Sequence, residues 1–124
     1  MTEPYPATAR EAIVVFHFAD RIKAELLIAS RLLAAVLTLQ GEQRQGGGRV
    51  FLEYLQGLEQ EINLGSARIK APEMVRLKTV IKGLLGMADA GMYQDIQEHL
   101  TWMLTIMTTY AQRALEFLFK EKLM

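Results

Sequence analysis

The chain contains no cysteine among its 124 residues. This absence excludes a disulfide framework, a thiolate zinc site, an iron–sulfur cluster and a cysteine nucleophile. Histidine occurs only twice, as His17 and His99, so the usual general base and the commonest metal ligand are both scarce. No serine lies in a nucleophile motif. We therefore expect a protein that is not an enzyme and that uses no cofactor.

An excess of either charge is also missing, because 14 basic and 14 acidic side chains give a formal net charge of zero. DNA and RNA binding draws on a basic excess that displaces counterions, so the composition argues against a nucleic-acid partner. Hydrophobic residues make up 51% and charged residues 23%, which is typical of a folded chain rather than a disordered one. The length suits a single domain over residues 1–124.

The sequence has no run long and apolar enough to cross a bilayer, which takes roughly 20 mostly apolar residues. The most apolar stretch, Leu26 to Leu39, contains Arg31 and is bounded by Glu25 and Glu42. An arginine near the bilayer centre costs at least about 2.5 kcal/mol. The N-terminal residues also lack the basic-then-apolar layout of a signal peptide. These features favour a cytoplasmic protein and argue against a membrane partner.

Alternating strand patterns are absent as well, and helical periodicity dominates the chain. Thr8 and Glu11 form a capping-box pattern that opens a first helix, and Pro72 suits the first turn of a third. We expect four helices, over residues 8–40, 49–64, 72–88 and 93–123, with the glycine-rich stretch 41–48 as a loop. The lengths are long, short, short, long. Short connections then predict an all-α, up-down-up-down four-helix bundle.

The first predicted helix carries more apolar surface than one bundle contact requires. Its main seam, through Val15, Leu26 and Leu33, follows alternating three- and four-residue steps. A second apolar line lies about 100° around the same helix, and a partial counterpart lies on the fourth helix. The second lines are Ile28, Leu32, Ala35 and Leu39 on the first helix, and Trp102 and Ile106 on the fourth. They have two interpretations: flanks of a wide intramolecular core, or a surface for self-association.

If the second line were left in water, it would form an apolar patch of several hundred Å², which soluble monomers rarely tolerate. We therefore predict a homodimer or higher oligomer that largely buries Ile28, Leu32, Ala35 and Leu39 between subunits, with help from Trp102 and Ile106. A two-fold interface presents the same patch twice. Leu32→Glu is expected to abolish assembly, whereas Arg31→Glu, one position away, is expected to change it little.

Two other patterns suggest ligand sites, but each lacks the further residues or elements that such a site requires. His17 with Asp20, and His99 with Asp95, have helical spacing. The two pairs are expected roughly 20 Å apart along an antiparallel bundle, so we predict no shared metal site. The stretch QGGGR at 45–49 precedes a helix but lacks the strand and the Lys-Ser or Lys-Thr ending of a phosphate loop, so a linker is expected.

The charge is balanced globally but polarised locally. One stretch of the sequence is basic and contains a single acidic residue, Glu73. Its basic residues are Arg68, Lys70, Arg76, Lys78 and Lys82. This basic run is either a solvated surface or a docking surface for an acidic protein partner.

The seven methionines have two interpretations, as core filler or as an adaptable binding surface. Gly57 and Gly83 lie inside predicted helices and are expected to permit close helix contact, since glycine there costs up to about 1 kcal/mol.

These observations predict a non-enzymatic helical protein-interaction module, such as an adaptor, a chaperone-like protein or a regulator, that binds first of all to itself. Two alternatives come from other classes. One is a small-molecule or cofactor carrier with a cavity between the long helices. The other is a peripheral membrane binder that uses the apolar stretch Leu27 to Leu39.

Overall fold

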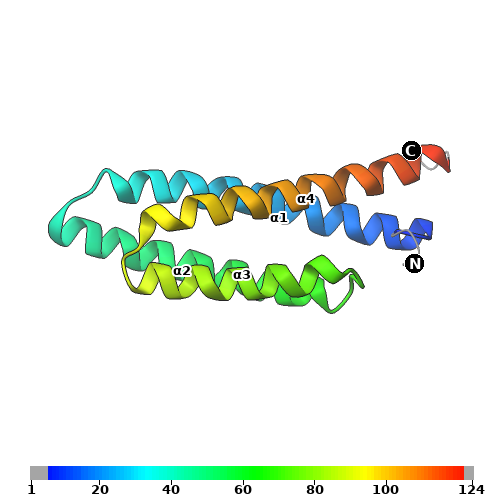
Figure 1. Cartoon of the computed structure of the whole chain (residues 1–124). Helices are drawn as coiled ribbons and strands as arrows, with labels where there is room; N and C mark the ends of the chain where they lie inside the picture. Colours follow the sequence, from blue (N-terminus) through cyan, green and yellow to red (C-terminus); the bar gives the residue numbers. More distant parts are fainter. Residues whose placement is uncertain (1–5, 122–124) are drawn as a thin grey trace.

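A computed structural model describes residues 6–121 of the chain. These residues form four α-helices: α1 (Ala9–Leu37), α2 (Gly41–Ser66), α3 (Pro72–Asp89) and α4 (Tyr93–Lys120). Each helix runs antiparallel to the next, and α1 packs against both α2 and α4 (Figure 1). Helix α3 closes the ring by packing against α2 and α4. The predicted up-down four-helix bundle is confirmed.

The ends of the helices follow the sequence signals at several points. The Thr8 side chain accepts a hydrogen bond from the Glu11 amide at 3.1 Å, and Glu11 Oε1 accepts one from the Thr8 amide at 3.1 Å. The predicted capping box is therefore present. Pro72 lies in the first turn of α3, and Gly91 adopts a φ of 74° in the turn before α4. The predicted end of the last helix, residues 122 and 123, lies outside the described residues.

The predicted loop over residues 41–48 is wrong, because α2 begins at Gly41 and α1 ends at Leu37. The four helices have 29, 26, 18 and 28 residues, so only α3 is short. Tertiary contacts explain the difference. Arg44 donates hydrogen bonds to the carbonyl oxygens of Leu39 and Leu37, at 2.7 and 2.9 Å, and thereby ties the first turn of α2 to the end of α1. Packing of this kind outweighs weak helix propensity.

The core is apolar throughout. Val15, Leu26 and Leu33 of the predicted main seam of α1 are all buried, and no polar or charged residue between residues 6 and 121 is buried. Three of the methionines, Met74, Met103 and Met107, are buried in the core, where they act as filler. Each fully buried large side chain contributes roughly 1.5–3 kcal/mol to folding. Burial of apolar side chains thus stabilises the interior, and the polar bonds between helices lie at or near the surface.

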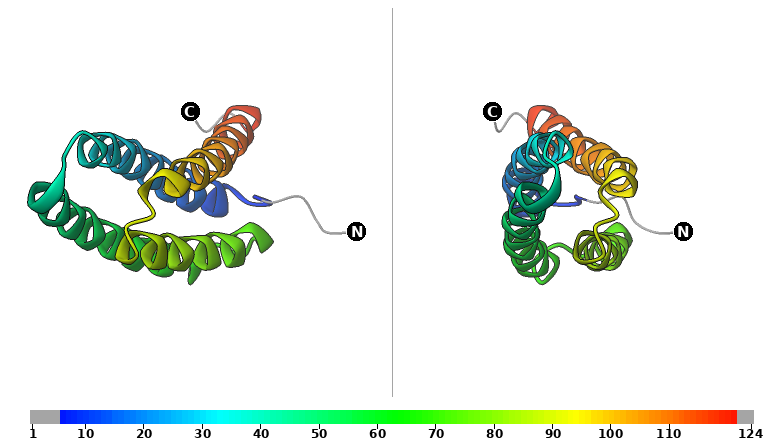
Figure 2. Two further views of the ribbon diagram at one scale, coloured as in Figure 1. Left: turned by 60° about the vertical axis from the view of Figure 1, so that its left-hand side comes forward. Right: turned by 90° about the vertical axis from the view of Figure 1, so that its left-hand side faces the viewer.

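The helices do not all extend to the same point along the bundle axis. The start of α1 and the end of α4 project beyond the α2–α3 hairpin, as Figure 1 shows. Seen along the bundle, α1 and α2 form one side and α3 and α4 the opposite side (Figure 2).

Candidate functional site

Polar bonds define the edges along which α1 and α2 meet. Arg21 Nη2 lies 2.7 Å from Glu61 Oε1, and Tyr54 OH lies 2.5 Å from Glu25 Oε2. The Tyr54 hydroxyl also lies 3.0 Å from the Glu25 carbonyl oxygen. Burial and the hydrogen bond to Glu25 raise the pKa of Tyr54 well above its usual value. The charged groups between the two helices are therefore already bonded to each other.

Two exposed stripes that are largely apolar flank these bonded edges. Exposed Arg31 lies on the α1 stripe, three residues after Ile28, and exposed Glu53 lies beside the α2 stripe, three residues after Val50. On α2, Val50, Gly57 and Leu64 are seven residues apart, which places them on one line beside Tyr54 and Glu61. On α1 the corresponding line lies beside Arg21 and Glu25. We call these two lines together the α1–α2 face: Ala24, Ile28, Ala35, Val50, Gly57 and Leu64. Ile28, Val50 and Leu64 are 47%, 64% and 70% exposed, so large apolar side chains of both helices lie in water on this face.

The structure divides the predicted self-association line of α1. Ile28 and Ala35 are exposed on the α1–α2 face. Leu32 is half-buried and packs against the core, as the wide-core interpretation expects. Leu39 is half-buried, and its side chain lies over Gly47 of α2.

The predicted counterpart on α4 lies on the other side of the bundle. Trp102 and Ile106 are half-buried and pack against the core. The guanidinium of Arg76, from α3, lies 5.5 Å from the centroid of the Trp102 ring. Since α3 and α4 form the side opposite α1 and α2 (Figure 2), one two-fold interface does not hold both Ile28 and Trp102.

Sequence reasoning missed Val50, Gly57 and Leu64 as surface partners of Ile28. Their seven-residue spacing is visible in the sequence. All three residues lie within the helix predicted over residues 49–64, but the spacing alone does not show which neighbouring helix their line adjoins.

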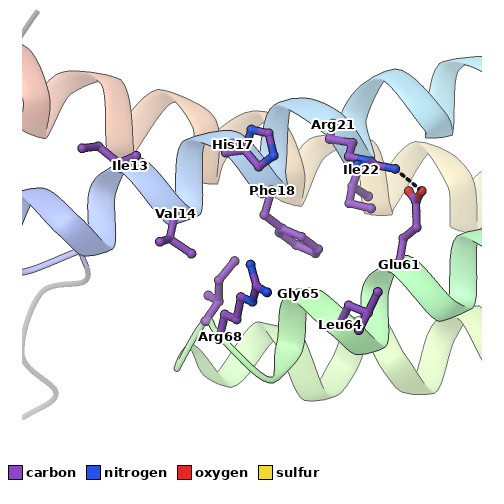
Figure 3. A pocket seen from close by; sticks show the side chains of 11 residues that line it. Ile13, Val14, His17, Phe18, Arg21, Ile22, Glu61, Leu64, Gly65 and Arg68 are labelled. Carbon is purple, nitrogen blue, oxygen red and sulfur yellow. Dashed lines mark hydrogen bonds and ion pairs between the residues drawn. The ribbon is translucent and has the colours of Figure 1, made fainter.

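A groove of about 400 Å³ opens at the end of the α1–α2 face, next to the turn between α2 and α3 (Figure 3). Buried side chains form its floor: Phe18 and Ile22 from α1, and Ile69 from the turn. Exposed side chains form its rim, Ile13 on α1 and Leu64 on α2. The groove therefore presents a continuous apolar surface between two helices.

Gly65 makes this floor possible. A methyl group added at Gly65 would overlap ring atoms of Phe18, so the ring lies directly on the backbone of α2. Close approach of a side chain to a helix backbone is a recurrent reason for glycine inside a helix. Figure 3 shows the Phe18 ring extending from α1 toward Gly65.

Four ionisable side chains surround the apolar floor: His17, Arg21, Glu61 and Arg68. The Glu61 carboxylate, through its hydrogen bond and its charge, raises the pKa of Arg21. The second oxygen of that carboxylate, Oε2, is buried without a hydrogen-bond partner in the described part of the chain. Arg68 extends toward Phe18 from the opposite side of the groove (Figure 3). Two guanidinium groups thus share the groove with one carboxylate.

The two histidines lie in different surroundings. His17 lines the groove, whereas His99 Nδ1 donates to the Asp95 carbonyl oxygen one turn earlier, at 2.9 Å. Between residues 6 and 121, no three histidine or acidic side chains are grouped so that they could hold a metal ion. Over the same range, no helix combines the length and the apolar character needed to span a bilayer.

The basic run does not form one surface. Arg68 lines the groove beside α1, whereas Arg76 lies over Trp102 on the α3–α4 side. Lys70 and Lys82 are exposed and Lys78 is half-buried. Because Arg68 and Arg76 face opposite sides of the bundle, a single acidic partner surface does not reach both.

The expectation that Gly57 and Gly83 permit close helix contact is wrong. A methyl group added at either position would meet open space. The close approaches are at Gly65, under Phe18, at Gly48, where an added methyl group would overlap the hydroxyl of Tyr93, and at Gly47, where it would crowd the end of the Leu39 side chain. Glycine alone in a helical pattern does not show which of these situations applies.

No family model, curated protein or solved structure significantly matches this chain.

Proposed function

We propose that this chain is a non-enzymatic helical interaction module that binds a second copy of itself through the α1–α2 face. The observation that carries the proposal is the joint exposure of the large apolar side chains of Ile28, Val50 and Leu64 on one side of the bundle. An apolar patch that spans two helices is typical of an interaction site. The small residues Ala24, Ala35 and Gly57 between them allow a partner helix to approach closely.

The charges on this surface favour docking. Arg21 forms an ion pair with Glu61, and the Glu25 carboxylate accepts a hydrogen bond from the neutral Tyr54 hydroxyl. An unpaired buried charge is the main electrostatic obstacle to an interface. The Arg21–Glu61 pair reduces that obstacle, because its two charges already balance each other.

The size of the face is sufficient for a stable dimer. At about 1.5 Å per residue, α2 is roughly 40 Å long, and two adjacent helices present a surface about 20 Å wide. The resulting area of roughly 800 Å² per subunit equals that of a standard interface. Each large side chain that becomes fully buried contributes roughly 1.5–3 kcal/mol, against several kcal/mol of lost rotational and translational freedom. A two-fold arrangement counts every such side chain twice.

Substitution of one exposed valine by glutamate tests the proposal, with a second valine as a matched control. Val50, on the face, is 64% exposed, and Val75, on α3, is 68% exposed. We expect the unmodified protein to be a dimer at micromolar concentration, Val50→Glu to be monomeric, and Val75→Glu to remain dimeric. Size-exclusion chromatography with light scattering measures the mass, and circular dichroism checks that both variants remain helical.

Two results would contradict the proposal. One is an unmodified protein that is monomeric at micromolar concentration. The other is equal dissociation of Val50→Glu and Val75→Glu, which would place the interface elsewhere. Leu32→Glu is a poorer test than Val50→Glu, since Leu32 packs against the core and its replacement disturbs folding as well as assembly.

A further inference from the structure

We infer that the groove between α1 and the end of α2 binds an amphipathic carboxylate, which is an apolar chain with a single anionic head group. This inference does not depend on the proposed self-association, although Leu64 belongs both to the groove and to the α1–α2 face. Three observations carry the inference: the apolar floor, the excess positive charge and the size.

The floor and rim fit an apolar chain. Phe18, Ile22 and Ile69 are buried beneath the groove, and Ile13 and Leu64 are exposed along its edges. A chain that lies on the floor between Ile13 and Leu64 covers apolar surface on both sides. Its transfer from water onto these side chains is the driving force for binding.

The charges fit an anionic head. Arg21 is bonded to Glu61 and closes the groove toward the middle of the bundle (Figure 3). Within residues 6–121, Arg68 forms no ion pair with a carboxylate, and its guanidinium lies across from Phe18. A guanidinium and a carboxylate form a strong, charge-assisted hydrogen-bonded pair. Arg68 therefore supplies the partner for the head group, and Phe18 the surface for the chain beside it.

The size fits a small molecule better than a protein segment. A volume of about 400 Å³ lies at the small end of the usual range for ligand pockets. A stable protein interface requires roughly 1,000 Å² of buried surface, far more than this groove offers. The favoured occupant is thus a free amphiphile.

Three probes with the same twelve-carbon chain and different head groups test the inference: dodecanoate, dodecanol and dodecyltrimethylammonium. Isothermal titration calorimetry on the full chain, below the concentration at which the probes form micelles, measures each affinity. We expect dodecanoate to bind at least about tenfold more tightly than the cationic probe, with dodecanol in between, because one charge-assisted pair is worth about that factor.

Variants then locate the site. Arg68→Gln is expected to reduce dodecanoate affinity about tenfold and to leave dodecanol binding unchanged. Lys82→Gln, which removes an exposed charge from the far part of α3, is the control and is expected to leave both unchanged. NMR spectra of labelled methyl groups are expected to show shifts at Ile13, Leu64 and Ile69 on addition of dodecanoate.

Equal binding of the anionic and cationic probes would overturn the inference, as would full dodecanoate affinity in Arg68→Gln or methyl shifts confined to other residues. The test is independent of the dimer. Val50→Glu is expected to retain dodecanoate binding as a monomer, and Arg68→Gln is expected to retain the mass of the unmodified protein. Loss of one property without the other shows which of the two proposals fails.

Discussion

The contact between α1 and α4 differs in kind from the contact between α1 and α2. The first is the most extensive contact in the bundle, and it is apolar along its length. Buried alanines on both helices allow their backbones to approach: Ala12, Ala19, Ala29, Ala111 and Ala114. The second contact is less extensive, and besides buried apolar side chains it includes separate points where a side chain of α1 lies on a glycine of α2 or a polar pair bridges the helices.

This difference shows how one helix serves two purposes. A continuous apolar contact spreads its stabilisation over many small contributions, so one substitution in it lowers the free energy of unfolding by only part of the total. Contact at separate points concentrates the stabilisation at a few positions and leaves the surface between them available to partners. The α1–α2 side therefore carries both the exposed face and the groove. Substitutions at the points of contact are expected to have the largest effects.

Gly65→Ala is expected to have the largest effect on stability. The added methyl group would overlap the Phe18 ring, and overpacking of this kind costs about 1–3 kcal/mol. Gly57→Ala is the matched control on the same helix, where the methyl group meets open space, and it is expected to stabilise by up to about 1 kcal/mol. Urea unfolding measures both. Equal stability of the two variants would show that the position of Phe18 does not depend on Gly65.

Gly48→Ala is expected to cost less, about 1 kcal/mol. The atom that the methyl group would meet first is the hydroxyl oxygen of Tyr93, at the far end of a half-buried side chain that can move. In a Tyr93→Phe background the same substitution is expected to cost less still. If urea unfolding gives the same cost in both backgrounds, the hydroxyl is not the obstacle.

The pair of Tyr110 and Glu73 joins α4 to α3 and is expected to make stability depend on pH. The Tyr110 hydroxyl donates to Glu73 Oε2 at 2.6 Å, and this bond holds the pKa of Glu73 below its usual value. The folded state thus binds this proton less readily than the unfolded state. Its contribution, about 1 kcal/mol, is present above the ordinary glutamate pKa and is lost as the pH falls through the lowered value.

Glu73→Gln removes the titrating group and provides the comparison. The variant is expected to lose less stability than the unmodified protein between pH 6 and pH 3, as measured by urea unfolding at each pH. Parallel pH profiles for the two proteins would contradict a role for Glu73 in this dependence.

The Arg21–Glu61 pair is expected to have the smallest effect. Arg21 is 60% exposed, and solvent screening makes ion pairs of exposed side chains weak. A double-mutant cycle with Arg21→Ala and Glu61→Ala measures the coupling, which is expected to be small and to decrease in high salt. A coupling larger than the effect of Gly65→Ala would show that α1 and α2 are joined mainly by this pair and not by the glycine contacts.

The fold was predictable because its signals are local. The capping box at Thr8, the proline at Pro72 and the three- and four-residue steps of the α1 seam each act within a few residues of sequence. The start of α2 was not predictable in this way, because it depends on bonds from Arg44 to the end of the previous helix. Local propensity alone favours a loop at such a glycine-rich stretch.

The candidate site was predictable only in part, and for the same reason. Ile28 and Ala35 were identified from the surplus of apolar residues on α1. The groove was not, since its floor combines Phe18 of α1 with Gly65 of α2 and Ile69 of the turn. The glycines show the limit most clearly: Gly57 and Gly65 lie on the same helix, and only the position of the Phe18 ring distinguishes them.

The glycine-rich first turns of α2 have a consequence for local motion. Gly46, Gly47 and Gly48 favour the helical state weakly, and the segment is held by Arg44 and by contacts with Leu39 and Tyr93. Such a segment opens at a lower free energy than the core of the bundle. Its backbone amides are therefore expected to exchange with solvent deuterium earlier than those in the middle of α1, and an opening of this segment would uncover Leu39 while the rest of the bundle stays folded.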